Sequence, residues 1–210
     1  MTTDNFMIAD GDDAKRLSEQ SSTPATKHNY VKLKAGESLR VILLDAKFPN
    51  YYGHGDFAKK IPSHVCTAPR AGMPCLSCDA EVKRSVKYLV PLYDVDKKEV
   101  IIWDTSKTHV SSVYAIIDTY GEDVCDEIFQ LKRTGAGAKD TSYSFIPLPP
   151  KQKAAIEVPA DIKPFEYGSQ ERSDFYASIL RAPTEDWLKK IIGNNQDVAS
   201  AEGQGDEHGF

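Results

Sequence analysis

The feature that most constrains this chain is a cluster of cysteines near its middle. Three of the four cysteines, Cys66, Cys75 and Cys78, fall within 13 residues, and the last two form a C-x2-C pair. Two thiolates at that spacing can both bind one tetrahedral ion, as they do in zinc knuckles. The sequence therefore predicts a structural Zn²⁺ site that organises the surrounding loop.

A zinc site of this kind needs a fourth ligand, and two histidines compete for the position. His54 lies twelve residues before Cys66, which leaves enough chain to wrap around the ion. His64 lies two residues before Cys66, so on a strand the two side chains share a face. Three thiolates and one imidazole suit a closed structural site rather than a catalytic site with an open position. The spacing leaves both histidines as candidates.

Other uses of the cysteines fit the sequence less well. A thioredoxin-type redox pair would need a helix beginning at the pair within a βαβ frame, which the pattern lacks. A zinc deaminase would show H-x-E before P-C-x-x-C; Pro74 and the cysteine pair supply the second half, but no H-x-E occurs. Paired carboxylates, a Ser/His/Asp set and a nucleotide-binding loop are also missing, so we expect no enzymatic activity. Cys125, which is flanked by acidic residues, is expected to pack rather than react.

Charge and composition divide the chain into a folded middle and two acidic ends. Residues 28–103 hold twelve basic and eight acidic residues, and residues 193–210 hold four acidic and no basic ones, within a net charge of −5. Because both ends are rich in small polar residues, we expect a flexible arm at 1–27 and a disordered tail at 193–210. We expect the folded domain at 28–149, with a zinc knuckle at 54–78, and a Pro-rich, then helical, extension at 150–192.

The sequence also bears on location. It has no run of about 18 apolar residues, as a membrane span would require. Its first residues lack the basic-then-apolar pattern of a secretory signal. We therefore expect a soluble cytoplasmic protein.

The hydrophobic pattern predicts a mostly β domain with minor α content. Alternation indicates strands at 39–44 and 61–66, one hairpin of 86–93 with 100–103, and another of 129–133 with 141–146. Between the hairpins, Val110, Val113, Tyr114 and Ile117 recur at helical spacing, and Gly121 is placed to end that helix. This order fits an OB-fold, a small antiparallel Greek-key barrel, with the zinc-binding loop as an insertion.

Basic and aromatic residues are interleaved around the cysteine cluster. Single-stranded nucleic acid is bound by cationic grooves that hold the phosphates and by rings that stack on the bases. Aromatic residues of strands also form protein cores. The pattern therefore predicts that these residues as a group include a nucleic-acid interface, without assigning each of them to it. The candidates are Tyr51, Tyr52, Lys59, Lys60, Lys83, Arg84, Lys87, Tyr88, Tyr93 and Trp103, with Lys132 and Arg133 as a second basic strand end.

Together these residues resemble the zinc-containing, helix-destabilising proteins of T-even-type phages, which bind single-stranded DNA. The likeness rests on the order His54, Cys66, Cys75, Cys78, on the basic and aromatic segment 82–88, and on the two hairpins with their helix. It implies an OB-fold that coats single strands without sequence preference during viral DNA replication, recombination and repair in the host cell cytoplasm. It also favours His54 over His64 as the ligand, and it points to Lys83, Arg84, Lys87, Tyr88, Tyr93 and Trp103 as DNA contacts.

The acidic last segment completes the resemblance. Asp206, Glu207 and Phe210 are similar to the protein-recruiting tails of phage and bacterial single-strand binders, which implies replication or recombination proteins as partners. The chain could also form a homo-oligomer. Two alternatives stay open from the residues: an RNA-binding zinc protein, and a zinc-stabilised protein-interaction module.

Overall fold

The computed structural model describes residues 28–56, 58–68, 74–137 and 140–201, and the chain divides into two compact units. We call residues 51–86 and 180–201 the cysteine unit, and residues 28–50 and 87–179 the sheet unit. The arm expected at 1–27 lies outside the described residues, as does the segment 202–210.

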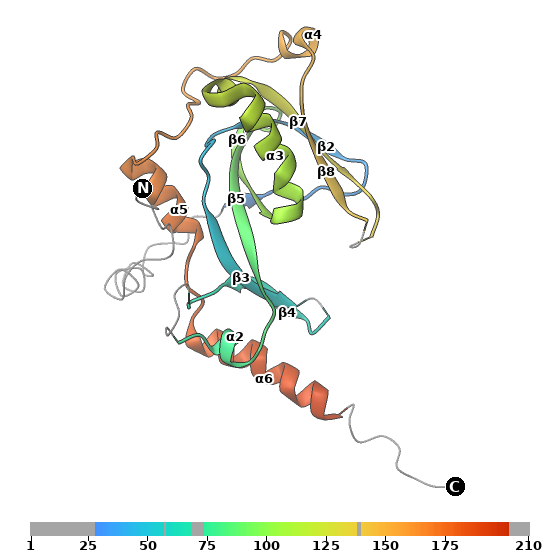
Figure 1. Cartoon of the computed structure of the whole chain (residues 1–210), viewed down its shortest axis with the longest axis vertical. Coiled ribbons are helices and arrows are strands. Elements are labelled where there is room, and N and C mark those ends of the chain that lie inside the picture. Colours follow the sequence, from blue (N-terminus) through green and yellow to red (C-terminus); the bar gives the residue numbers. More distant parts are fainter. Residues whose placement is uncertain (1–27, 57, 69–73, 138–139, 202–210) are drawn as a thin grey trace. The chain divides into compact units, whose positions relative to one another are not determined.

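Strands dominate the chain, with a few helices between and after them (Figure 1). In chain order the elements are β1 (Asn29–Tyr30), β2 (Ser38–Leu43), β3 (Asn50–Asp56), β4 (Ile61–Val65), α2 (Leu76–Asp79), β5 (Arg84–Asp94), β6 (Glu99–Ser106), α3 (Lys107–Tyr120), the 3-10 helix η2 (Gly121–Asp126), β7 (Ile128–Thr134), β8 (Ser142–Pro147), α4 (Pro150–Lys153), α5 (Gln170–Ile179) and α6 (Glu185–Ala201). The expectation of a mostly β chain with minor helix is confirmed.

The strands form a mixed eight-stranded sheet. Its order is β1-β6-β5-β2-β7-β8, and β3 pairs with both β4 and β5. β1 runs parallel to β6, whereas β2, β5, β6, β7 and β8 pair antiparallel. Both predicted hairpins are present: Tyr93 is paired with Val100 in the first, and Arg133 with Tyr143 in the second.

The sheet does not close into the barrel that an OB-fold would require. Among the described strands, β8 pairs through its backbone with β7 alone. Side chains fill the space toward β6, where the ring of Tyr143 lies 5.1 Å from that of Trp103 and 4.9 Å from that of His109. α3 packs against both β6 and β8 (Figure 1). These side-chain contacts take the place of a closing backbone ladder.

The apolar stripe that predicted α3 faces the interior of the sheet unit. Val110 and Val113 are buried, and Gly121 ends the helix with a positive φ of 60° that glycine adopts readily. Tyr114, which the helical spacing placed in the same stripe, is exposed. The helix that the pattern predicted is therefore present, although its apolar face is narrower than expected.

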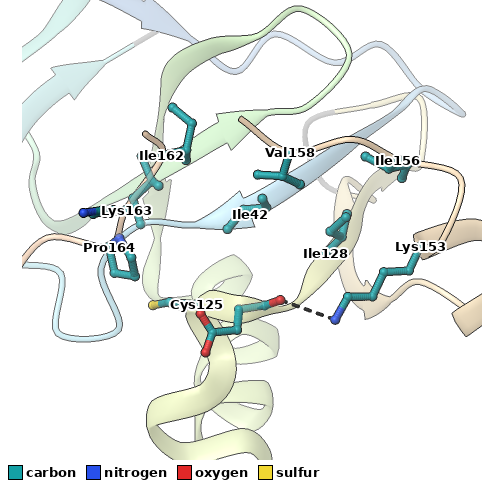
Figure 2. A pocket seen from close by; sticks show the side chains of 11 residues that line it. Ile42, Cys125, Ile128, Lys153, Ile156, Val158, Ile162, Lys163 and Pro164 are labelled. Atoms are coloured by element: carbon teal, nitrogen blue, oxygen red, sulfur yellow. Dashed lines mark hydrogen bonds between the residues drawn. The ribbon is translucent and has the colours of Figure 1, made fainter. Parts of the chain in front are cut away.

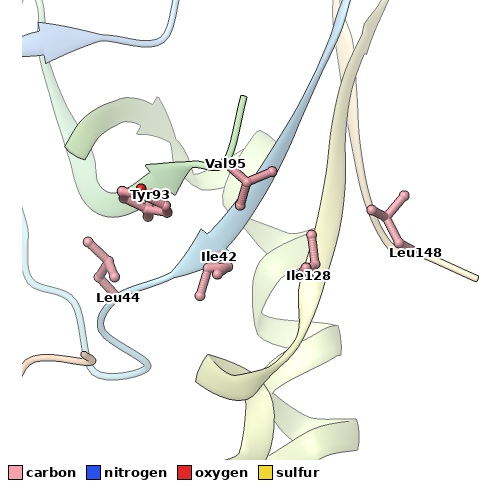
Figure 3. Packing of buried hydrophobic residues seen from close by; sticks show 6 residues of the cluster. All are labelled: Ile42, Leu44, Tyr93, Val95, Ile128 and Leu148. Atoms are coloured by element: carbon pink, nitrogen blue, oxygen red, sulfur yellow. The ribbon is translucent and has the colours of Figure 1, made fainter. Parts of the chain in front are cut away.

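A second apolar cluster lies on the face of β2, β5 and β7. Figure 3 shows its members, which are Ile42, Leu44, Tyr93, Val95, Ile128 and Leu148. Half-buried residues of the Pro-rich extension pack on it, among them Ile156 and Phe165. A cavity of about 270 Å³ lies beside the cluster and is lined by Cys125, Asp126, two lysines and apolar side chains (Figure 2).

α5 is fixed to the sheet unit by a buried ion pair. The Arg172 guanidinium, 1 % exposed, donates from Nε to Asp45 Oδ2 at 2.7 Å and from Nη2 to the Lys47 carbonyl at 2.6 Å. The Tyr176 hydroxyl donates to the same Asp45 oxygen at 2.7 Å. This network makes residues 170–179 an integral part of the sheet unit.

Two segments differ from the sequence expectations. The sequence predicted no strand at residues 50–56, yet β3 runs through Gly53 and Gly55. β4 passes so close to β3 that a Cβ on Gly55 would lie 3.2 Å from Ser63 Cα. α6 runs to Ala201, so the boundary expected at residue 192 between extension and tail lies inside a helix.

Candidate metal centre

Short elements of the cysteine unit bring four candidate ligands together. β3 supplies His54, the residue directly after β4 is Cys66, and Cys75 is the N-cap of α2, which contains Cys78. A helical turn places Cys75 and Cys78 on one side of α2. The pairing of Gly53 with Val65 sets β3 beside β4, so both strands deliver their ligands to the same place.

The four ligand atoms of this Cys₃His cluster match the size of a tetrahedral zinc site. They all lie within 4.8 Å of one another. The Cys66 sulfur lies 3.9 Å from that of Cys75 and 3.7 Å from that of Cys78, and His54 Nε2 lies 3.6 and 3.4 Å from the sulfurs of Cys75 and Cys78. Tetrahedral ligation at the usual zinc distances separates sulfurs by about 3.8 Å, and sulfur from nitrogen by about 3.5 Å. A disulfide would need about 2.05 Å, and all the cysteines are free.

The hydrogen bond made by His54 leaves the correct nitrogen available. Its Nδ1 lies 2.9 Å from the backbone carbonyl of Val82. A carbonyl only accepts hydrogen bonds, so Nδ1 must carry the proton. In the neutral ring, Nε2 then has a free lone pair, and this atom faces the sulfurs of Cys75 and Cys78. Ligating histidines generally donate their other nitrogen in this way. His54 is therefore held as a metal ligand would be held.

The ionisation of Cys75 and Cys78 also favours a cation. Burial opposes ionisation of Cys75, but hydrogen bonds with Thr67 and Cys78 outweigh it and lower the pKa of Cys75 to about 6. Burial, with the neighbouring Cys66 and Cys75, raises the pKa of Cys78 to about 12. The Cys75 thiolate therefore forms readily and disfavours the thiolate of Cys78, so a bound cation is needed to stabilise both thiolates together. Metal binding should then release protons and weaken as the pH falls.

His64, the rival ligand, lies outside the cluster. Its Nδ1 donates to the Pro62 carbonyl at 2.8 Å, so its Nε2 accepts from the Ser77 hydroxyl at 2.8 Å. Its ring stacks on that of His54 with centroids 5.6 Å apart. Of the two histidines that the spacing left open, the structure places His54 among the thiols and gives His64 a supporting position.

The donor set fits zinc better than other common ions. Thiolate and imidazole ligands in a tetrahedral arrangement are typical of structural zinc, whereas Mg²⁺ and Ca²⁺ prefer oxygen. His54, Cys66 and Cys75 are buried and Cys78 is half-buried, so four protein ligands enclose the position. Such a site can cross-link β3, β4 and α2, and it offers no open coordination position for catalysis.

The predicted nucleic-acid residues fall into three groups by exposure. Lys59, Lys60, Lys83, Arg84 and Lys132 are exposed. Tyr52, Lys87, Tyr88 and Arg133 are half-buried. Tyr51, Tyr93 and Trp103 are buried, the last two at 2 % and 3 % exposure. Base stacking needs an accessible ring, so the buried three serve the core, and we leave them out of any interface.

The two predicted arginines, Arg84 and Arg133, differ in the groups that they contact. The Arg84 guanidinium lies over the Tyr52 ring, 4.6 Å from its centroid, and a hydrogen bond with Cys66 raises the pKa of Arg84. Arg133 is engaged within the sheet unit, because Nη1 donates to the Leu33 carbonyl at 2.7 Å and Nη2 to Thr141 Oγ1 at 3.2 Å. Arg133 is therefore a structural tie, whereas Arg84 and Lys83 face solvent.

Sequence reasoning missed the supporting residues of the cluster. Ser77, which is fully buried and bonded to His64, had no signal beyond its place inside the C-x2-C pair. The Val82 carbonyl is a backbone group that no side-chain pattern reveals. The predicted tail residues Asp206, Glu207 and Phe210 lie outside the described part of the chain.

Comparison with known proteins adds no relative to this picture. No family model, curated protein or solved structure matches the chain. In the described part of the chain, the helices are too short or too polar to span a bilayer.

Proposed function

We propose that this chain binds single-stranded DNA without sequence preference, and that a structural zinc held by His54, Cys66, Cys75 and Cys78 supports the binding surface. In this account it protects single strands during viral DNA replication, recombination and repair, as the phage helix-destabilising proteins do. The segment with Asp206, Glu207 and Phe210 recruits other replication or recombination proteins.

The observation that carries the proposal is the position of Arg84 and Tyr52 beside the Cys₃His cluster. The guanidinium stacked on the ring supplies a cation for phosphate and a planar, ring-backed surface on which a base can stack. Lys83 adjoins this pair, and its carbonyl accepts the Gly55 N–H at 3.3 Å, which ties the start of β5 to β3. A cationic and aromatic surface is what non-specific binding of single strands requires.

The metal ligands fix the backbone that bears this surface. Tyr52 lies two residues before His54, and its carbonyl accepts the Cys66 N–H at 2.8 Å. The hairpin that follows ends in a turn with Lys59 and Lys60, both exposed. Bound zinc supplies a cross-link between these strands, and the chain's own residues do the binding. Lysines and Arg84 neutralise phosphates, and the Arg84 guanidinium, stacked on Tyr52, offers a flat surface to a base.

The sheet unit offers a second basic surface. Lys132 on β7 is exposed, and Ser38, its partner on β2, follows a loop that contains the exposed Lys32 and Lys34. The loop is attached to β7 because the Gly36 N–H donates to the Arg133 carbonyl at 2.9 Å. Each phosphate that these lysines neutralise would add to affinity by releasing counterions.

Replacing Lys83 and Arg84 together by alanine should weaken binding of oligo-dT about tenfold or more at low salt. The slope of log affinity against log salt should become less steep by about 1.4, because two phosphate contacts are lost at about 0.7 each. Fluorescence anisotropy of a labelled oligonucleotide over a salt series measures both quantities.

A matched control is the double variant Arg40→Ala, Lys97→Ala, which removes the same charge from exposed residues that are paired with Asp96 and Glu99. It should retain nearly the full affinity and slope. Equal losses in the two double variants would mean that net charge alone drives binding, and the surface at Arg84 and Tyr52 would lose its role. Zinc content is measured on both variants to confirm an intact metal centre.

A further inference from the structure

α6 is built against the metal centre as part of the cysteine unit. It contacts α2 and β4, and its first turn is capped by Thr184, whose hydroxyl oxygen accepts the Trp187 N–H at 3.4 Å. Leu188 is 4 % exposed, whereas the neighbouring Trp187 is 36 % exposed. A cavity of about 350 Å³ is lined by Leu76, Asp79 and Ala80 from the α2 region and by Lys189 and Ile192 from α6. The helix therefore rests on the element that holds two of the ligands.

A chain of ring contacts connects α6 to the cluster directly. The His64 ring stacks on the ligand His54 at 5.6 Å, and it also meets the Trp187 ring in a T-shaped contact at 5.4 Å. His64 Nε2 also accepts a hydrogen bond from Ser77, which lies between Cys75 and Cys78. His64 therefore contacts three parts of the cysteine unit: the ligand His54, Ser77 of α2, and Trp187 of α6.

The surface on which α6 rests depends on those ligands. α2 has only four residues, far fewer than an isolated helix needs for stability in water. Cys75 begins it and Cys78 lies within it, so ligation of both thiolates fixes its turn. Without the cross-link, this turn is held by the Ser77–His64 hydrogen bond and by a few backbone bonds, such as that from the Val82 N–H to the Ser77 carbonyl at 2.9 Å.

We propose that docking of α6 and metal binding at the Cys₃His cluster are energetically coupled through α2 and His64. Bound zinc orders the surface on which α6 packs, and the packed helix holds α2 and His54 in ligating positions. By linkage the coupling is reciprocal: whatever metal adds to the docking of α6, a docked α6 adds to metal affinity. His64 is a positioning residue in this arrangement, and α6 connects the metal state to the segment that follows it.

The test is the zinc affinity of a Leu188→Ala variant, measured by competition with a chromogenic chelator in the absence of nucleic acid. The variant should bind one equivalent about 5- to 50-fold more weakly than the wild type. Leu148→Ala, the same truncation at a buried position of the sheet unit, should leave zinc affinity unchanged. A His64→Ala variant should be weakened in the same direction as Leu188→Ala.

Hydrogen exchange supplies an independent readout. On removal of zinc from the wild type, amides of residues 185–193 should exchange at least tenfold faster, while those of α3 stay protected. Equal zinc affinity for the wild type and Leu188→Ala would overturn the coupling, even if the metal centre itself is real. A wild type that binds no zinc would overturn the metal assignment and the coupling together. Neither outcome depends on whether the chain binds DNA.

Discussion

A Cys66→Ser variant should lose its zinc and the order of the cysteine unit. Cys66 is fully buried, and its sulfur lies within 3.9 Å of both other cluster sulfurs, so a hydroxyl there removes a central ligand. Structural zinc contributes about 10–16 kcal/mol of apparent binding free energy, much of which is folding free energy. We expect one equivalent of zinc in the wild type after dialysis and almost none in the variant, with a loss of protected amides in residues 51–86.

The fourth cysteine and the second histidine provide matched controls. Cys125 lies in η2 of the sheet unit, where burial raises the pKa of its thiol to about 11, so Cys125→Ser should retain a full equivalent. His54→Ala should lose the metal, whereas His64→Ala should retain one equivalent at excess zinc. Retention of zinc by Cys66→Ser, or loss in His64→Ala with retention in His54→Ala, would contradict the ligand assignment.

Removal of the Asp45 carboxylate should produce the largest loss of stability in the sheet unit. Asp45 accepts hydrogen bonds from Arg172, Tyr176 and the Lys47 N–H, and Asp45→Ala would leave the guanidinium buried without its counter-ion. Breaking a buried pair from one side generally costs 3–5 kcal/mol. Urea unfolding followed by the fluorescence of Trp103, in a Trp187→Phe background, measures this change.

Asp96→Ala is the appropriate comparison. Asp96 also pairs with an arginine, Arg40, but both side chains are largely exposed, so its removal should cost about 0–1 kcal/mol. A double variant, Asp45→Leu with Arg172→Met, should recover much of the loss, because no buried charge is left uncompensated. Equal destabilisation by Asp45→Ala and Asp96→Ala would mean that burial of the Arg172 pair has little energetic consequence.

The local hydrophobic pattern of the sequence predicted the elements that bury one face against the core. The helical spacing of Val110, Val113 and Ile117 located α3, and alternation located both hairpins, because each reflects the burial of one face. β3 was missed because Gly55 sits where β4 approaches closely, a tertiary constraint that composition alone cannot distinguish from a turn. The open edge beside β8 likewise depends on how Tyr143 packs with Trp103 and His109.

The candidate site was predicted unevenly for a similar reason. Spacing identified the three thiols, but it could not choose between His54 and His64, since the choice depends on which imidazole the fold places beside the sulfurs. The interleaving of basic and aromatic residues along the sequence could not show that the Tyr93 and Trp103 side chains face the core. The Asp45–Arg172 pair joins residues 127 apart and has no signal in the sequence.

Binding of the wild-type chain to labelled oligo-dT of about 30 nucleotides, followed by fluorescence anisotropy from low to high salt, tests the central claim most directly. The account predicts saturable binding at low salt, a negative slope of log affinity against log salt, and weaker binding to a duplex of equal length. Oligo-U, run in parallel, separates DNA from RNA preference. Absence of binding at low salt, or a duplex bound as tightly as the single strand, would contradict the proposed function.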